Sequence, residues 1–241
     1  MTPPLFSCVF EILFTRVSIH FSRLILVLAP LALCNSVCHA ADNSGILLQI
    51  VQHCVNINQP DYCDQCRAPQ RAAGCKGKNT CQATSEIWAE SDEFVALRDI
   101  KMCGCPDDFV HGLVLPKSVI SGIEDDLRPN AIWQFAWDVA LQRMPVNEIA
   151  LAVNSKSKRT QNQLHVHLVR LNPNAQTRIA ASVVGVVSSL DDVWQFASQQ
   201  AMTRHMNEYG VLVAANEKEG FRVALTTESP EGQFTQAVCS P

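Results

Sequence analysis

The sequence of 241 residues lacks several patterns that mark large classes of proteins. It contains no run of Lys and Arg that could follow a phosphate backbone, and 19 basic and 23 acidic residues give it a formal net charge of -4. It has no His-Glu-x-x-His spacing, which binds zinc in many hydrolases. Internal repeats and low-complexity tracts are also absent. We therefore expect no nucleic-acid partner, no metal and no other cofactor.

The composition instead indicates a globular protein. Apolar residues make up 47% of the chain, which is ordinary for a folded domain. The length is sufficient for one compact domain or two very small ones. We therefore expect a packed core rather than disorder.

The first forty residues differ from the rest of the chain. Arg16 and Arg23 precede an apolar run from Leu24 to Cys34, and a small-residue site follows that ends at Ala40. This order is typical of an export signal, and the apolar run is shorter than the roughly 20 residues that span a bilayer as a helix. We predict a signal peptide over residues 1–40, cleaved near Ala40. An uncleaved membrane anchor is the alternative, because residues 5–21 are also apolar.

Cysteines are numerous for a chain of this length. Of the eleven, three lie in the predicted signal, which leaves an even set of eight. Five of these lie in a polar segment over residues 41–85, which we interpret as a cysteine-rich extension. Disulfides are favoured for an exported chain, and a zinc site is the alternative for the cysteines at 63, 66, 75 and 81. The eight are Cys54, Cys63, Cys66, Cys75, Cys81, Cys103, Cys105 and Cys239.

Hydrophobic periodicity predicts an α+β domain over residues 86–241, in which helices pack on an antiparallel sheet. Bulky residues recur at helical spacing within residues 130–143, where Trp133 and Trp137 are interpreted as core residues. Helices are also predicted over residues 46–54 and 191–206. Strands are predicted over residues 94–97, 110–115, 149–153, 164–171, 183–187, 210–215 and 221–226.

Two histidines stand one residue apart within the predicted strand over residues 164–171. Side chains alternate along a strand, so His165 and His167 point to one face, roughly 6 to 7 Å apart, while their apolar neighbours point to the other. Neutral imidazole is a competent nucleophile near pH 7. Half of a metal site and an ordinary surface pair are the alternatives for this spacing alone.

The polar loop before this strand supplies donors that could stabilise negative charge on phosphoryl oxygens. A loop between two core strands is also a common place for a site. The candidate substrate-binding residues in this loop are Asn154, Ser155, Arg159, Thr160, Gln161 and Asn162. Together, loop and strand indicate phosphoryl or nucleotidyl transfer.

This region resembles the histidine-triad (HIT-like) superfamily, whose signature is His-φ-His-φ-His with an asparagine eleven positions before the first histidine. Asn154 stands eleven positions before His165. The stretch over residues 111–117 is similar to the superfamily strand that ends in Pro-Lys. Within the superfamily the sequence resembles the CDP-diacylglycerol diphosphatases (CDP-diacylglycerol pyrophosphatases) of bacterial envelopes, over about residues 90–228. The matching segments are 151–155, 159–162, 165–167, the tryptophan-containing helix from Asn130, and 205–206 with 209–210.

The resemblance implies a role for each matched residue. His167 takes the place of the nucleophilic histidine, His165 of a phosphate-ordering histidine, and Asn154 of the pocket asparagine. Asn162 stands where the superfamily uses a small polar phosphate contact. Val169 occupies the place of the third histidine, a departure that leaves open what assists the leaving group. Tyr209 and His205 are either pocket residues or helix-end packing.

The implied activity is hydrolysis of CDP-diacylglycerol, a membrane lipid, to CMP and phosphatidate. The implied location is the periplasmic face of the bacterial inner membrane, or the periplasm. Two alternatives stay open at this point. One is an exported hydrolase of soluble nucleotide diphosphate derivatives, and the other is a non-catalytic cysteine-rich binding module on the same fold.

Overall fold

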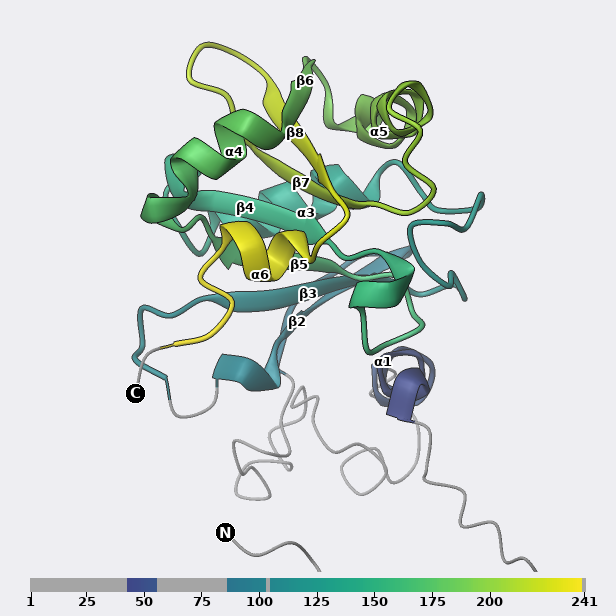
Figure 1. Ribbon diagram of the computed structural model, residues 1–241. Coiled ribbons are helices and arrows are strands. Elements are labelled where there is room, and N and C mark those ends of the chain that lie inside the picture. The colour runs from purple at the N-terminus through teal and green to yellow at the C-terminus, as the bar shows by residue number, and fades with distance from the viewer. Residues whose placement is uncertain (1–42, 56–85, 103–104, 240–241) are drawn as a thin grey trace, which may run out of the picture. The chain divides into compact units, whose positions relative to one another are not determined.

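Eight antiparallel strands form a single sheet in the computed structural model, which describes residues 43–55, 86–102 and 105–239 (Figure 1). Their order across the sheet is β1-β2-β3-β5-β4-β7-β8-β6. The predicted α+β class is thereby confirmed. The strands are β1 (Ile87–Glu90), β2 (Phe94–Arg98), β3 (His111–Pro116), β4 (Ile149–Val153), β5 (Val166–Arg170), β6 (Val183–Val187), β7 (Gly210–Ala215) and β8 (Phe221–Thr226).

Most predicted elements are present, with shifts at their ends. The helix predicted over residues 46–54 is an α-helical turn, α1 (Ile46–Gln49), that continues as a π-helix, η2 (Ile50–Cys54). The two longer predicted helices are α3 (Ile132–Leu141) and α5 (Val193–Thr203). Strand β1 and two short helices, α4 (Gln176–Ser182) and α6 (Pro230–Phe234), were not predicted. Short 3-10 turns are η1 (Asn43–Gly45), η4 (Ile100–Met102), η5 (Val146–Glu148), η6 (Lys156–Lys158), η7 (Pro173–Ala175) and η8 (Leu190–Asp192).

Helices α3 and α5 cover one face of the sheet and form the largest core with it. Trp133 is fully buried and Trp137 nearly so, which confirms their interpretation as core residues. The ring of Trp133 also lies 4.6 Å from that of Trp194 in α5, between centroids. Alternation along β4 and β5 sends Leu151 and Leu168 to this face.

The opposite face carries two smaller apolar clusters. One lies under α4 and α6 and includes Val169 and Phe234. The other lies under α1 and η2 and includes Leu47 and Leu113. Figure 1 shows α4 and α6 in front of the sheet and α3 behind it. His167 pairs in register with Leu113 and stands two residues before Val169, so it lies where the two clusters meet.

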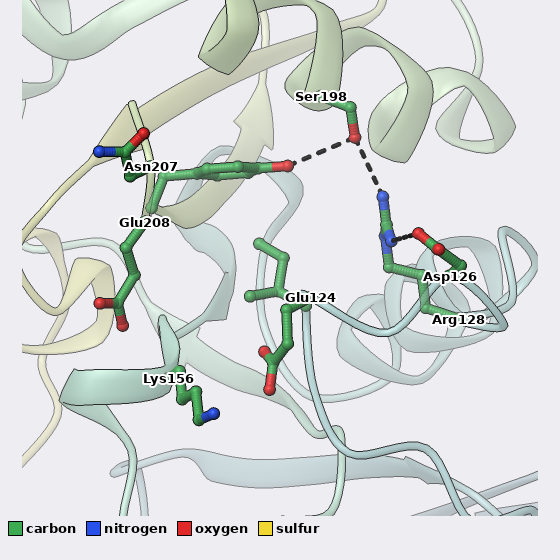
Figure 2. A pocket seen from close by; sticks show the side chains of 9 residues that line it. Glu124, Asp126, Arg128, Lys156, Ser198, Asn207 and Glu208 are labelled. Atoms are coloured by element: carbon green, nitrogen blue, oxygen red, sulfur yellow. Dashed lines mark hydrogen bonds and ion pairs between the residues drawn. The ribbon is translucent and has the colours of Figure 1, made fainter. Parts of the chain in front are cut away.

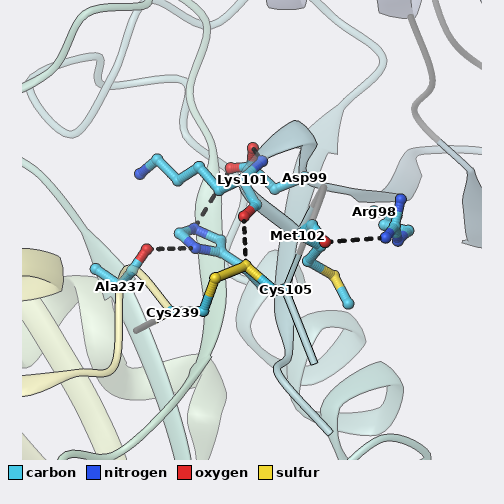
Figure 3. Close-up of a disulfide and its surroundings, with 8 residues drawn as sticks. Arg98, Asp99, Lys101, Met102, Cys105, Ala237 and Cys239 are labelled. Atoms are coloured by element: carbon cyan, nitrogen blue, oxygen red, sulfur yellow. Dashed lines mark hydrogen bonds and ion pairs between the residues drawn. A yellow bond between two sulfur atoms is a disulfide. The ribbon is translucent and has the colours of Figure 1, made fainter. Parts of the chain in front are cut away.

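The C-terminal segment returns to the end of β5. After α6, Thr235 forms a β-bridge with Leu171, and the Gln236 amide donates to the Arg170 carbonyl oxygen at 2.8 Å. Cys239 then forms a disulfide with Cys105, 134 positions earlier, with 5.7 Å between their Cα atoms (Figure 3). The segment is therefore held at one end against β5 and at the other by the disulfide to Cys105, between η4 and β3.

Several sequence-based predictions lie outside the described residues. These include the export segment over residues 1–40 and the cysteines between residues 63 and 81. Among the residues that are described, no helix combines the length and apolar character needed to cross a bilayer.

Candidate active site

His165 and His167 bring two imidazole rings together at the start of β5. The ring centroids are 4.8 Å apart, closer than strand spacing alone gives, and both side chains are buried. The strand begins at Val166, two residues later than predicted. Before it, the Leu164 amide donates to the Ile120 carbonyl oxygen, so this part of the chain bonds to a loop instead of a neighbouring strand.

A third imidazole comes from β3. The Nε2 atom of His111 lies 3.2 Å from the Nδ1 atom of His167. The Nδ1 atom of His111 lies 3.1 Å from the Ala237 carbonyl oxygen. In the sheet register His111 stands opposite Val169, the position at which the sequence lacks a third histidine. Sequence analysis noted His111 only as part of a strand ending in Pro-Lys and did not place it in the site.

These contacts assign the protons on the three rings. A carbonyl oxygen only accepts, so the Nδ1–H of His111 donates to Ala237 and, in the neutral ring, its Nε2 accepts. The Nδ1–H of His167 then donates to His111, which leaves the Nε2 of His167 without a proton. The Nδ1–H of His165 likewise donates to the Gln163 carbonyl oxygen at 2.7 Å.

Burial keeps the rings neutral. It lowers the pKa of His111 and of His165 and lowers the pKa of His167 well below its ordinary value. The neighbouring rings and Lys101 lower the pKa of His167 further, because each disfavours another positive charge. Asp99 opposes the effect of burial at His111, with its Oδ2 atom 3.4 Å from Nε2.

Asn154 lies between the histidines and the C-terminal segment. Its Oδ1 accepts a hydrogen bond from the Ser229 hydroxyl at 2.8 Å, and the Glu231 carboxylate, which only accepts, determines which way the amide points. Its Nδ2 donates to the Glu231 carboxylate at 3.0 Å and lies 3.4 Å from the Nε2 of His167. The two protons of the Asn154 amide therefore face the Glu231 carboxylate and the Nε2 atom of His167.

Glu231, in α6, places a carboxylate beside the Nε2 atom of His167. Its Oε2 lies 3.3 Å from that Nε2, and its Oε1 lies 3.4 Å from the Nε2 of His111. The Lys101 ammonium donates to the same Oε1. Sequence analysis missed Glu231, although Ser229 and Pro230 before it are typical of the start of a helix.

One group among the described residues could hold a metal ion. Asp99, His111 and His167 each offer a ligand atom within 4.8 Å of the others. The Nε2 of His111 and the Nδ1 of His167 are hydrogen-bonded to each other, so an ion bound by these two nitrogens would replace that bond.

Three of the other predicted loop residues, Arg159, Gln161 and Asn162, bond to groups other than the histidines. Arg159 forms a two-pronged ion pair with Glu124, at 2.7 and 2.5 Å, which lowers the pKa of that carboxyl. The Gln161 side chain accepts from the Leu47 amide, and the backbone of Asn162 donates to Ser44. Thr160 and the Asn162 side chain are exposed, whereas Ser155 is fully buried beside Asn154.

A pocket of about 280 Å³ adjoins this loop (Figure 2). Lys156, two residues after Asn154, reaches it from one side. Glu124, the partner of Arg159, reaches it from another. Tyr209 lines the pocket and also packs against α5, with its hydroxyl 3.3 Å from that of Ser198, whereas His205 is exposed at the end of the helix. The full lining is Ile123, Glu124, Asp126, Arg128, Lys156, Ser198, Asn207, Glu208 and Tyr209.

A protein-family model matches most of the described chain. Residues 43–208 match the family described as CDP-diacylglycerol pyrophosphatase. The matched range contains all three histidines, Asp99, Lys101 and Asn154 and ends before α6. Glu231 and its helix therefore lie beyond the part of the chain that the family model describes.

Proposed function

Because the chain belongs to the CDP-diacylglycerol pyrophosphatase family, we propose that it hydrolyses CDP-diacylglycerol to CMP and phosphatidate with His167 as the nucleophile. The substrate's pyrophosphate joins a water-soluble nucleotide to a membrane lipid. We further propose that the reaction takes place at the periplasmic face of the bacterial inner membrane, or in the periplasm, in keeping with the predicted export segment.

The observation that carries this proposal is the chain of contacts from the Ala237 carbonyl oxygen through His111 to the Nδ1 atom of His167. The hydrogen bond from this Nδ1 to His111 leaves a lone pair on Nε2, and the lowered pKa of His167 keeps that nitrogen free of a proton at neutral pH. A nucleophile in this state needs no base to remove a proton before attack. Asn154 donates toward the same point and could bond a phosphoryl oxygen there.

The reaction would proceed in two steps. The Nε2 of His167 attacks the cytidylyl phosphorus, the bond from that phosphorus to the bridging oxygen breaks, and phosphatidate leaves with the electron pair. Water then attacks the same phosphorus, the P–N bond breaks, and its electron pair returns to Nε2 as CMP leaves. His165 would order the phosphate from the adjacent position. The HIT-like superfamily is the fold to which we assign this arrangement.

The predicted loop residues would complete phosphate binding. Ser155, Thr160, Gln161 and Asn162 belong to the segment that follows Asn154, and Arg159 would contribute after exchanging Glu124 for a phosphate. Such an exchange replaces one bidentate anion by another, which suits the planar guanidinium.

A turnover assay with purified enzyme tests the proposal. We expect CMP and phosphatidate from CDP-diacylglycerol in detergent micelles, and much slower release of CMP from a water-soluble CDP ester. Comparable rates on the soluble ester would favour a soluble nucleotide substrate. No turnover of either substrate would favour a binding module.

His167→Ala is the decisive variant in this assay. Loss of a covalent nucleophile should lower turnover by several orders of magnitude, on the order of 10⁴-fold or more. His205→Ala, which removes an exposed histidine, is the matched control and should retain activity. More than a tenth of wild-type activity in a folded His167→Ala enzyme would contradict the nucleophile assignment.

A further inference from the structure

Glu231 brings a carboxylate into the centre of the histidine cluster. It is 7% exposed and contacts His167, His111, Asn154 and Lys101. Burying a carboxylate is costly unless other groups compensate it. The amide of Asn154 and the ammonium of Lys101 supply that compensation here. Two hydrogen-bond donors therefore hold the carboxylate beside the reacting nitrogen.

The fold determines the position of Glu231. Helix α6 begins at Pro230, with the Ser229 hydroxyl accepting from the Gly232 amide at 3.0 Å. Three residues after Glu231, Phe234 is fully buried in the cluster that contains Val169. A Cβ on Gly210 would lie 2.6 Å from Pro230 and 2.8 Å from the Val153 carbonyl oxygen, so the helix start sits close against β4 and β7.

The proposed reaction needs a proton acceptor in its second step. Water is a weak nucleophile toward a phosphorus bonded to His167, and a base that takes its proton accelerates attack. The base must lie within a hydrogen bond of a water that can reach this phosphorus. Glu231 meets this condition, because its Oε2 lies 3.3 Å from Nε2 in the free enzyme. A water molecule that donates a hydrogen bond to Oε2 would lie beyond that carboxylate oxygen, at one hydrogen-bond length from it.

The other groups in the cluster are less suited to this task. The Nε2 of His111 accepts from His167, and the Oδ2 of Asp99 lies 3.4 Å from that same Nε2, whereas Glu231 lies 3.3 Å from the Nε2 of His167. His165 is a weak proton acceptor, because burial lowers its pKa. Asn154 and Lys101 face the site as proton donors.

We propose that Glu231 is a catalytic residue, the general base that hydrolyses the cytidylyl-histidine. This inference rests on the proposed function. In the first step the carboxylate turns aside as the phosphorus approaches Nε2, and it keeps its contacts with Asn154 and Lys101. In the second step it takes one proton from the attacking water. The water oxygen bonds to phosphorus, the P–N bond breaks, and CMP leaves. The proton then passes to solvent.

Glu231→Gln tests this role, because it removes the charge and retains the shape of the side chain. We expect a burst of about one equivalent of phosphatidate per enzyme, followed by turnover on the order of 10²- to 10⁴-fold slower than wild type. With substrate labelled in its cytidine, the labelled cytidylyl group should remain bonded to His167 after an alkaline quench. Mass spectrometry should locate it on that residue. A side chain with a merely structural role would not cause this adduct to accumulate.

Glu228→Gln is the matched control. Glu228 also pairs with a lysine, Lys158, but its side chain is exposed and it precedes helix α6. Its substitution should leave the steady-state rate within about twofold and give no adduct. If the Glu231→Gln enzyme fails to fold, Glu231→Asp, which keeps the charge but is one methylene shorter, replaces it under the same criteria.

Two outcomes would overturn the proposal. One is a Glu231 variant that turns over within threefold of wild type. The other is a slow, folded variant that gives neither a phosphatidate burst nor an adduct, since its defect would then precede the second step. Failure of the proposed function itself is distinguishable, because the wild-type enzyme would then release no CMP from CDP-diacylglycerol.

Discussion

The Nε2 atom of His111 accepts a hydrogen bond from the Nδ1 of His167 across the β3–β5 pair, at 3.2 Å. The carbonyl oxygen of Ala237 determines the direction of this bond, because it can only accept from the other nitrogen of His111. A group in the C-terminal segment thus sets the tautomer of the proposed nucleophile, two hydrogen bonds away.

His111→Gln should therefore impair the chemical step more than substrate binding. Without the imidazole acceptor, His167 is no longer held in the tautomer that has a lone pair on Nε2. We expect kcat to fall by about 10²-fold or more with KM little changed, since an incorrect histidine tautomer is known to be damaging in hydrolases. Steady-state kinetics check this, with His205→Ala as the control. A raised KM with an unchanged kcat would instead give His111 a role in binding substrate.

The buried histidines should make the stability of the protein sensitive to mild acid. Their pKa values are lowered in the folded state, so between the folded and unfolded values the unfolded chain binds more protons. Their contribution is fully present above the unfolded pKa of about 6.5 and is lost as the pH falls below it. Urea unfolding at pH 7, 6 and 5 should show the free energy of unfolding decreasing over this range.

A variant that carries both His165→Gln and His167→Gln isolates the histidines in this measurement. It should lose less stability between pH 7 and pH 5 than the wild type. Glu124, Asp125 and Glu208 have lowered pKa values too, but their contribution is lost at lower pH, near the ordinary range of carboxyl groups. Equal losses in variant and wild type would show that the histidines do not cause the pH dependence.

The purified mature protein should contain few or no free thiols and no bound zinc. Cys105 and Cys239 form a disulfide in the structure, and disulfides are the favoured prediction for the cysteines that it does not describe. Thiol titration under denaturing, non-reducing conditions, with metal analysis of the same sample, checks both statements. One equivalent of zinc with four reactive thiols would support the alternative prediction for the cysteines at 63, 66, 75 and 81.

Replacing Cys239 should affect both stability and catalysis. The disulfide ends the segment that carries Ala237, whose carbonyl oxygen accepts from His111 (Figure 3). Removing a native disulfide from a small secreted domain typically costs about 2 to 5 kcal/mol. We expect Cys105→Ser/Cys239→Ser to unfold at lower urea and to lose part of its kcat. Full activity with unchanged stability would show that burial of Phe234 and the β-bridge of Thr235 hold the C-terminal segment in place without the disulfide.

Hydrolysis in oxygen-18 water should place the label in CMP and none in phosphatidate. The reason is that water releases the cytidylyl group from His167 by attacking the same phosphorus that His167 attacked. Mass spectrometry of both products reads the result. Label in phosphatidate would mean that water attacks the lipid-side phosphorus, and would exclude His167 as the nucleophile even if its substitution abolishes activity.

The sequence by itself determined seven of the eight strands and the part of the site that is local in the chain. Strands β6, β7 and β8 have the predicted bounds, because apolar and β-branched runs between turn residues favour one conformation without reference to the rest of the fold. Alternation along β5 likewise places His167 and Val169 on one face. Helix α6 was not predicted, because its five residues are too few to show a helical hydrophobic periodicity.

Tertiary structure alone decided which distant groups reach the histidines. His111 meets His167 across 56 positions, Asn154 meets Glu231 across 77, and Lys101 meets Glu231 across 130. These contacts depend on the strand order β3-β5-β4 and on the return of the C-terminal segment to β5, which local patterns do not encode. The same is true of Arg159. We expected this cation, beside a candidate phosphate site, to face the substrate. The fold instead brings Glu124 within reach of its guanidinium. A nearby carboxylate forms a bidentate pair with a guanidinium when no phosphate competes for it.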